Sequence, residues 1–398
     1  MQAAPRINAL EPEQISWLLG RWRFADDPDM ETHWLRKFRP RTRLLLLSIV
    51  TALTFLLLAY LNGGLTSPVG TRTAIGLIIN PSPRPARIGL GLLQDPVGLI
   101  TLAVILLTPI LFAEQVGAIQ KFNRMSEANI SYRASDLLCD KINHEVDLAN
   151  GHFRRIGDLW PSAAILVLSA MLSGWFSYLF NMHGLYPSWN KTDLTVGTWR
   201  RRVYAGWWAN PHSHLSLAIA LFCLGLYFFY FVIKQVTMGA YFAIYIHRVS
   251  SPSRGFGVCP NLKANTDGFW GLRPMRFFMQ ATYSSALGHT IMVVGILVVW
   301  LPFNSFTVFM LTVLITINIL VVVYPTMIGR SSAYGEKMRF VEKVLDGHEE
   351  PTAEEATVIA RVWDTQNLPF KLRSALTAVT VYLLFPLLLA VASKLLGP

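Results

Sequence analysis

Seven long apolar stretches, separated by polar loops, constrain the fold of this 398-residue chain more than any other feature. The hydrocarbon core of a bilayer is about 30 Å thick, so a helix needs roughly 20 apolar residues to cross it. Such segments must be helical, because backbone groups inside lipid have no water to bond. The predicted spans are Leu44–Leu61, Val97–Phe112, Ala163–Asn181, Leu215–Ile233, Ala286–Leu301, Thr307–Tyr324 and Ala375–Ala392. The sequence therefore predicts an all-α, polytopic membrane protein of about seven transmembrane helices.

Composition agrees with this class. The chain is 53% hydrophobic and only 15% charged, which is too apolar for a soluble protein of this length. Its net charge of +11 would suggest nucleic acid in a soluble protein. No nucleic-acid recognition motif accompanies the charge, so we interpret the basic residues as contacts to anionic lipid. Membrane lipids are thus expected partners, and nucleic acid is not.

Basic residues also predict an orientation. Of the 35 Lys and Arg residues, 27 fall in the N-terminal segment and in alternate loops, and eight fall on the opposite side. Cytoplasmic loops carry an excess of Lys and Arg. We therefore expect the N-terminus in the cytoplasm and the C-terminus outside. The expected organisation is a cytoplasmic segment, 1–43, and a membrane domain, 44–398, with cytoplasmic insertions at 114–160, 235–283 and 330–371.

These insertions should form a helical cytoplasmic layer. Glu114–Trp160 contains no proline, and the fourth span should continue as helix to about His247. Thr352 and Glu355 fit a capping box that opens a further helix. Such a layer can pack on itself, on neighbouring copies of the chain or on a cytoplasmic protein. We expect a homo-oligomer.

A cluster of arginine and tryptophan is predicted on the external side. It consists of Arg200, Arg201, Arg202, Trp207 and Trp208, with His212 and His214 nearby. One interpretation is an interfacial anchor at the level of the lipid headgroups. The other is a site for a lipid phosphate, because arginine forks match phosphate oxygens.

Acidic residues form a stripe in the first long insertion. Asp136, Asp140, His144 and Asp147 follow helical spacing and share one face. Carboxylates and imidazole together can hold a divalent cation. A solvated helix face explains the same stripe, and we predict no metal.

Two polar residues fall inside predicted spans. Asn318 lies deepest, and His289 lies about one turn inside the fifth span. Polar groups at such depths face the bundle interior or a water-filled path. They equally well form hydrogen bonds between helices. No Asp or Glu lies within any predicted span, which disfavours proton-coupled transport.

Two further motifs carry a resemblance to a known family. Ala205-Gly-Trp-Trp208 precedes an aromatic span, and Asn265-Thr-Asp-Gly-Phe-Trp-Gly-Leu272 follows it. This arrangement resembles a family of uncharacterised bacterial multi-pass membrane proteins with a Trp-Trp element and an "HPDxxGGL" loop. Asp267, Gly271 and Leu272 match that loop, whereas its His-Pro and its first glycine are replaced. The resemblance implies a bacterial inner-membrane location and no activity.

The loop itself has a physical interpretation. Asp267-Gly268 is typical of a turn, and Gly271 follows it in the family motif. A structural turn and a ligand site are both consistent with this pattern, since loops often carry function.

Three functions remain open. The chain shows no catalytic, nucleotide-binding or cofactor signature, and its layout resembles that of insect odorant and gustatory receptors in topology. We favour an oligomeric channel or gated pore, with His289 and Asn318 near its path. The alternatives are a lipid-handling or lipid-modifying protein, and a sensor or scaffold that binds a cytoplasmic partner.

Overall fold

The described part of the chain is almost entirely helical, as predicted. The computed structural model describes residues 8–15, 40–67, 72–79, 88–130, 136–185, 194–250, 273–300 and 350–364, together with part of 305–345. The principal helices are α2 (Pro40–Leu61), α3 (Ala74–Ile79), α4 (Pro96–Ile130), α5 (Asp136–Gly157), α6 (Leu159–His183), α7 (Val196–Ala205), α8 (Leu215–Ser250), α9 (Arg273–Val294) and α11 (Ala353–Asp364). Short 3-10 helices cover Pro12–Ile15 and Leu92–Gln94, and a π-helix, Gly295–Trp300, continues α9.

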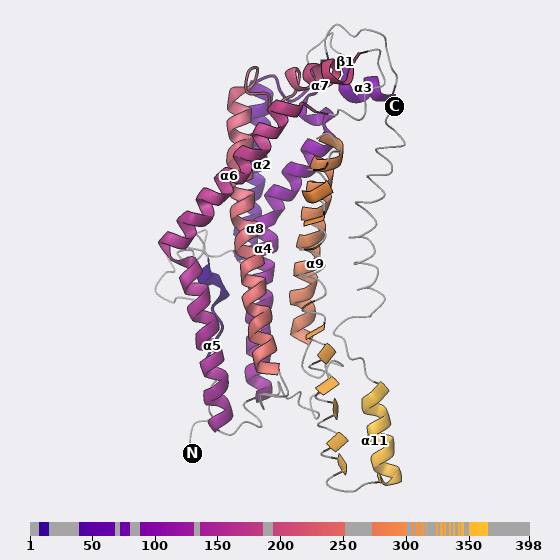
Figure 1. Ribbon diagram of the computed structural model, residues 1–398. Coiled ribbons are helices and arrows are strands. Elements are labelled where there is room, and N and C mark those ends of the chain that lie inside the picture. Colours follow the sequence, from indigo (N-terminus) through magenta and orange to yellow (C-terminus); the bar gives the residue numbers. More distant parts are fainter. Residues whose placement is uncertain are drawn as a thin grey trace.

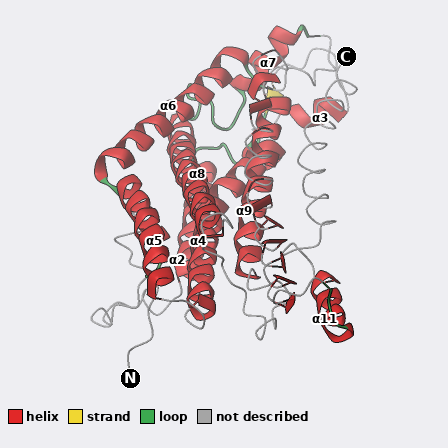
Figure 2. Cartoon of the chain, turned by 60° about the horizontal axis from the view of Figure 1, so that its bottom comes forward, coloured by secondary structure: helices red, strands yellow, loops and turns green. Residues whose placement is uncertain are grey.

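The long helices form one bundle (Figure 1). Helix α4 packs on α2, α8 and α9, and α6 packs on the other side of α8. Helix α7 lies across one end of the bundle, and α5 descends from α6 toward the opposite end (Figure 2). We call these the α7 end and the α5 end.

Three helices are long and apolar enough to cross a membrane: Pro96–Gln120, Leu159–His183 and Leu215–Val249. They correspond to the second, third and fourth predicted spans. The first predicted span forms a shorter apolar helix, Leu45–Leu61, within α2. The fifth lies on α9 and the π-helix, the sixth is described only in part, and Ala375–Ala392 lies outside the described residues. The helices that the structure describes therefore associate this protein with a membrane.

Local sequence explains where these helices begin and end. Asp95 precedes α4, its Oδ1 accepts a hydrogen bond from the Gly98 N–H (3.0 Å), and Pro96 occupies the first helical position. Helix α6 ends at Gly184, whose φ of 65° needs glycine. It begins at Leu159, slightly before the expected start after Pro161. The capping box before α11 is confirmed: Thr352 N donates to Glu355 (2.8 Å), and Glu355 N donates to Thr352 Oγ1 (3.3 Å).

The predicted helical extensions beyond the spans are also confirmed. Helix α8 runs without a break to Ser250, and α4 continues to Ile130. Helix α5 then occupies most of the remaining insertion and meets α6 at a corner formed by Asp158.

The buried apolar residues form two clusters. One lies toward the α7 end and includes Phe55, Trp199, Trp207 and Trp208. The other lies toward the α5 end and includes Phe112, Phe153, Phe242 and Phe278. A two-residue parallel pairing of β1 (Arg72–Thr73) with β2 (Ile88–Gly89) is the only sheet in the described residues.

The segment 8–15 packs on α5 through polar contacts. Asn8 Nδ2 donates to Asp147 (3.1 Å), and Glu11 N donates to Asn150 Oδ1 (2.8 Å). Asp147 of the predicted acidic stripe therefore contacts the N-terminal segment, whereas Asp140 and His144 are exposed. Asp136 begins α5, and its side chain lies outside the described residues. Within the described residues, no group of three or more His, Cys, Asp or Glu is arranged to hold a metal ion.

Lys234 fastens the end of this segment to the bundle. Its side chain is fully buried, and Nζ donates to Ile15 O (2.7 Å), Ile156 O (2.5 Å) and Ser162 Oγ (2.9 Å). A lysine ammonium has three donors, so these three neutral oxygens satisfy it. One side chain thereby joins α8, the corner between α5 and α6, and the N-terminal segment.

Candidate functional site

Two adjoining pockets lie at the α7 end, between α6, α7 and the start of α8. The first has a volume of about 360 Å³ and the second about 400 Å³. Asn181 and Tyr204 line both pockets and form the wall between them. We call the pair the α7 cleft. Ligand pockets in proteins are roughly 300–1,000 Å³ in volume, so each pocket is large enough to hold part of a ligand.

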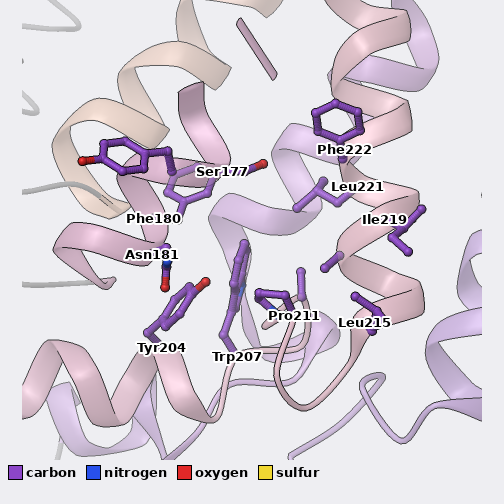
Figure 3. Close-up of a pocket in the computed structure, with 13 residues that line it drawn as sticks. Ser177, Phe180, Asn181, Tyr204, Trp207, Pro211, Leu215, Ile219, Leu221 and Phe222 are labelled. Carbon is purple, nitrogen blue, oxygen red and sulfur yellow. The ribbon is translucent and has the colours of Figure 1, made fainter. Parts of the chain in front are cut away.

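The first pocket is mainly apolar (Figure 3). Phe180, Asn181 and Tyr204 line one side, and residues of α8 face them across the opening. The α8 residues are Leu215, Ala218, Ile219, Leu221 and Phe222. Leu215 and Ile219 are more than half exposed, so the pocket opens toward the flank of the bundle.

The second pocket, which we call the polar pocket, is more polar than the first. Arg201, His212, Ser213 and Asn210 line it together with the two shared residues. Neither pocket is lined by Asp or Glu among the described residues. The cleft therefore joins an apolar hollow to a hollow with a positive charge at its rim.

A close helix crossing closes the inner end of the apolar pocket. Ser173 Oγ on α6 donates to Phe222 O on α8 (2.9 Å). A Cβ placed on Gly225 would lie 2.6 Å from Ser173 Oγ, so a larger residue would displace this hydroxyl and its hydrogen bond. From this crossing α6 and α8 separate toward the α7 end, and Tyr204 and Trp207 occupy the space between them.

Asp95 fixes the two tryptophan side chains, Trp207 and Trp208, beneath the α7 cleft. Its side chain is fully buried, and Oδ2 accepts hydrogen bonds from the indole N–H groups of Trp207 (3.1 Å) and Trp208 (2.9 Å). Its other oxygen caps α4. A Cβ on Gly98 would lie 2.8 Å from Asp95 Oδ2 and 3.1 Å from Trp208 Nε1, which explains glycine at that position. One carboxylate thus fixes both indoles and the start of α4.

Backbone hydrogen bonds hold the tryptophan loop in place. Leu90 N donates to Gly206 O, and Trp208 N donates to Leu90 O, each at 2.9 Å. A Cβ on Gly206 would lie 2.0 Å from Ile88 O, so the two segments could not approach this closely with any other residue. Asn210 adds a bond from Nδ2 to Tyr204 O (2.7 Å). These hydrogen bonds therefore fix the backbone of the loop that carries Trp207 into the cleft.

Aromatic contacts order the side chains of the wall. Trp207 packs edge-on against Phe180 (5.7 Å between ring centroids) and lies 6.0 Å from Tyr204. Burial raises the pKa of Tyr204, so its hydroxyl stays protonated at neutral pH. It can donate a hydrogen bond as well as accept one.

The predicted arginine and tryptophan cluster divides in the structure. Arg201 lines the polar pocket, whereas Arg200 and Arg202 do not line either pocket. Trp207 lines the apolar pocket. Trp208 is buried in the core and packs edge-on against Phe55 (5.8 Å).

The other predicted site residues lie elsewhere. His289 lies on α9 and lines neither pocket; its Nε2 is 3.4 Å from Thr108 Oγ1 and its Nδ1 3.5 Å from Ser285 Oγ. Asn318, Asp267, Gly268 and Gly271 lie outside the described residues.

Sequence reasoning did not identify two residues that shape the cleft, Asp95 and Asn181. The Asp-Pro pair at 95–96 is a recognisable helix start, and it could have indicated the cap. Its second role depends on indoles 112 and 113 positions later in the chain, which no local pattern indicates.

No protein-family model, curated protein or solved structure matches this chain.

Proposed function

We propose that this protein is a polytopic membrane protein that binds an anionic lipid in the α7 cleft. The main observation behind this proposal is that an apolar pocket and an arginine-lined polar pocket share one wall, formed by Asn181 and Tyr204. In this proposal an acyl chain occupies the apolar pocket, and the phosphate contacts Arg201 and His212. Arginine pairs with phosphate through charge-assisted hydrogen bonds, and the apolar pocket removes hydrocarbon from water.

The surroundings of the cleft support a lipid as the occupant. Tyr178, Leu215 and Ile219 line the apolar pocket and are each more than half exposed. Exposed apolar side chains at the mouth suit a ligand that enters from the bilayer. The distribution of Lys and Arg favours an external position for the α7 end, with the N-terminus in the cytoplasm. The family resemblance implies that the membrane is a bacterial inner membrane. The lipid would then come from the outer leaflet.

Replacing Arg201 with glutamine tests the headgroup contact. A hydrogen bond to a charged group contributes about 1.5–3 kcal/mol, so we expect binding of phosphatidylglycerol to weaken about tenfold or more. Binding of diacylglycerol, which has no phosphate, should change little. Both affinities are measured on the purified full chain by native mass spectrometry. Arg202→Gln is the matched control, because Arg202 is adjacent in sequence and lines neither pocket.

Two results would contradict the headgroup assignment. One is equal weakening by Arg201→Gln and Arg202→Gln, which would indicate general attraction to a basic surface. The other is equal affinity of the unsubstituted protein for phosphatidylglycerol and diacylglycerol.

Replacing Ala218 with phenylalanine tests the apolar pocket. Ala218 lines this pocket and is half-buried, so the added ring should occupy the space of the acyl chain. We expect affinity for phosphatidylglycerol and for diacylglycerol to fall together, by about tenfold. The Ala218→Phe variant should unfold at the same temperature as the unsubstituted protein. If neither affinity falls in such a variant, the acyl chain binds elsewhere.

The channel predicted from the sequence remains a separate proposal. In its favour, His289 lies at a part-buried contact between α4 and α9 with two hydroxyl side chains. Ion flux through proteoliposomes, compared between the unsubstituted protein and His289→Ala, tests it. The homo-oligomer and the cytoplasmic partner also stay predictions.

A further inference from the structure

A line of polar side chains follows the contact between α4, α8 and α9. We call it the polar seam; it consists of Thr101, Thr108 and Gln115 on α4, Gln235 on α8, and Thr282, Ser285 and His289 on α9. The α4 members are seven residues apart, so they share one face of the helix. The α9 members share a face as well, at spacings of three and four residues. Because α4 and α9 pack along their length, these two faces meet.

Hydrogen bonds connect neighbouring members of the polar seam. Gln115 Nε2 donates to Thr282 Oγ1 (3.2 Å), and Ser285 Oγ donates to Gln235 Oε1 (3.0 Å). His289 lies within 3.5 Å of both Thr108 and Ser285. Helix α8 also reaches the Gln115 amide, since a Cβ on Gly239 would lie 3.2 Å from Gln115 Nε2. All three helices therefore contribute to one polar environment.

Three buried polar atoms of the polar seam have no hydrogen-bond partner within the described structure. They are Thr101 Oγ1, Gln115 Oε1 and Gln235 Nε2. Their side chains are at most 5% exposed. A buried polar atom without a partner costs about 1–3 kcal/mol, and lipid offers it none. Such atoms are ordinarily satisfied by internal water.

The chemistry of the unpaired atoms fits water. Gln115 Oε1 is an acceptor, Gln235 Nε2 is a donor, and Thr101 Oγ1 can be either. A water molecule needs two to four polar partners of both kinds, and these atoms and their hydroxyl neighbours supply them. No Asp, Glu, Lys or Arg belongs to the polar seam. Lys234, adjacent to Gln235, instead contacts Ile15, Ile156 and Ser162.

A proline adds a further acceptor at the middle of the polar seam. Pro109 lies inside α4 and has no N–H, so it cannot donate to Ile105 O. The neighbouring Thr108 hydroxyl already donates to Val104 O (2.7 Å). Ile105 O, within one turn of Thr108, therefore lacks the donor that a helix normally supplies from position 109.

We propose that the polar seam binds a file of internal water molecules between α4, α8 and α9. The members from Thr101 to Gln115 extend about 21 Å along α4, at about 1.5 Å per residue. That is about two thirds of the hydrocarbon thickness of a bilayer. These water molecules would lie in a row within the membrane part of the bundle. The proposal does not depend on the lipid proposed for the α7 cleft.

A structure of the full chain in lipid nanodiscs, at a resolution that shows water, tests the proposal. We expect water density within hydrogen-bond distance of Gln115 Oε1 and Gln235 Nε2. A dry interface, in which no water lies within hydrogen-bond distance of Gln115 Oε1 or Gln235 Nε2, would overturn the proposal.

A stability measurement distinguishes the same alternatives independently. Gln115→Met with Gln235→Met removes both amide groups, and with them Gln115 Oε1 and Gln235 Nε2, at nearly constant volume. If the amides are hydrated, the unfolding midpoint should stay the same or fall, because satisfied hydrogen bonds are lost. A rise of several degrees would show that they are buried without partners, and would overturn the proposal. Thr237→Val is the matched control, since Thr237 Oγ1 donates to Ile233 O of its own helix (2.7 Å) and lies away from the polar seam.

Discussion

Asp95→Asn is expected to lower the unfolding midpoint of the purified protein by about 5 °C or more. The carboxylate accepts from Gly98 N and from both indole N–H groups. An asparagine has one side-chain oxygen, so it can serve the helix cap or the indoles but not both. Its amide nitrogen would then face donors inside the core. Hydrogen bonds to a charged group contribute about 1.5–3 kcal/mol each, so the loss should be large for a single isosteric change.

The control for this variant is Asp158→Asn. Asp158 precedes α6 as Asp95 precedes α4, but it is exposed and its side chain makes no capping hydrogen bond. We expect its midpoint to change by about 1 °C or less. The midpoint is measured by thermal unfolding monitored through tryptophan fluorescence. Equal changes in the two variants would show that Asp95 acts only as an ordinary charge before a helix.

The second large effect is expected for Lys234→Met. Methionine preserves the approximate volume but removes all three hydrogen bonds from Nζ. Two carbonyl groups and one hydroxyl lose a charged donor, and the segment 8–15 loses its attachment to α8. Because each such bond contributes about 1.5–3 kcal/mol, the population of released segment should rise about tenfold or more. Amide hydrogen exchange at residues 8–15 measures this population.

Arg154→Gln provides the comparison. Arg154 donates to Glu11 (3.0 Å) and Gln14 (2.6 Å) of the same segment, but its side chain is 60% exposed. Exposed ion pairs contribute about 0–1 kcal/mol, so exchange at residues 8–15 should rise by less than about fivefold. If Arg154→Gln releases the segment as strongly as Lys234→Met, the surface contacts hold it and Lys234 does not.

Much of the fold could be predicted from local patterns. Apolar length predicted the helices now described as Pro96–Gln120, Leu159–His183 and Leu215–Val249, because a bilayer requires about 20 apolar residues in each. The Thr352–Glu355 capping box was predictable because its partners are three residues apart. The extension of α8 to Ser250 followed from a stretch without helix breakers.

The candidate site was predictable only in part, because distant segments form it. The sequence indicated Arg201 and Trp207 as members of an aromatic and basic cluster, and both line the α7 cleft. It could not separate them from Trp208, which donates to the same Asp95 oxygen but is buried in the core. That separation depends on the pairing of Leu90 with Trp207, a contact between segments more than 100 residues apart.

The attachment made by Lys234 has a consequence for the order of assembly during synthesis. Ile15 leaves the ribosome 219 residues before the lysine that binds its carbonyl. At roughly 5–20 residues per second, this interval is about 10 to 40 s. During this interval, the segment 8–15 can contact its partners on α5 but not Lys234. Its attachment to the bundle stays incomplete until α8 has been made. The segment 8–15 therefore reaches its final place only after a residue 219 positions later has been made.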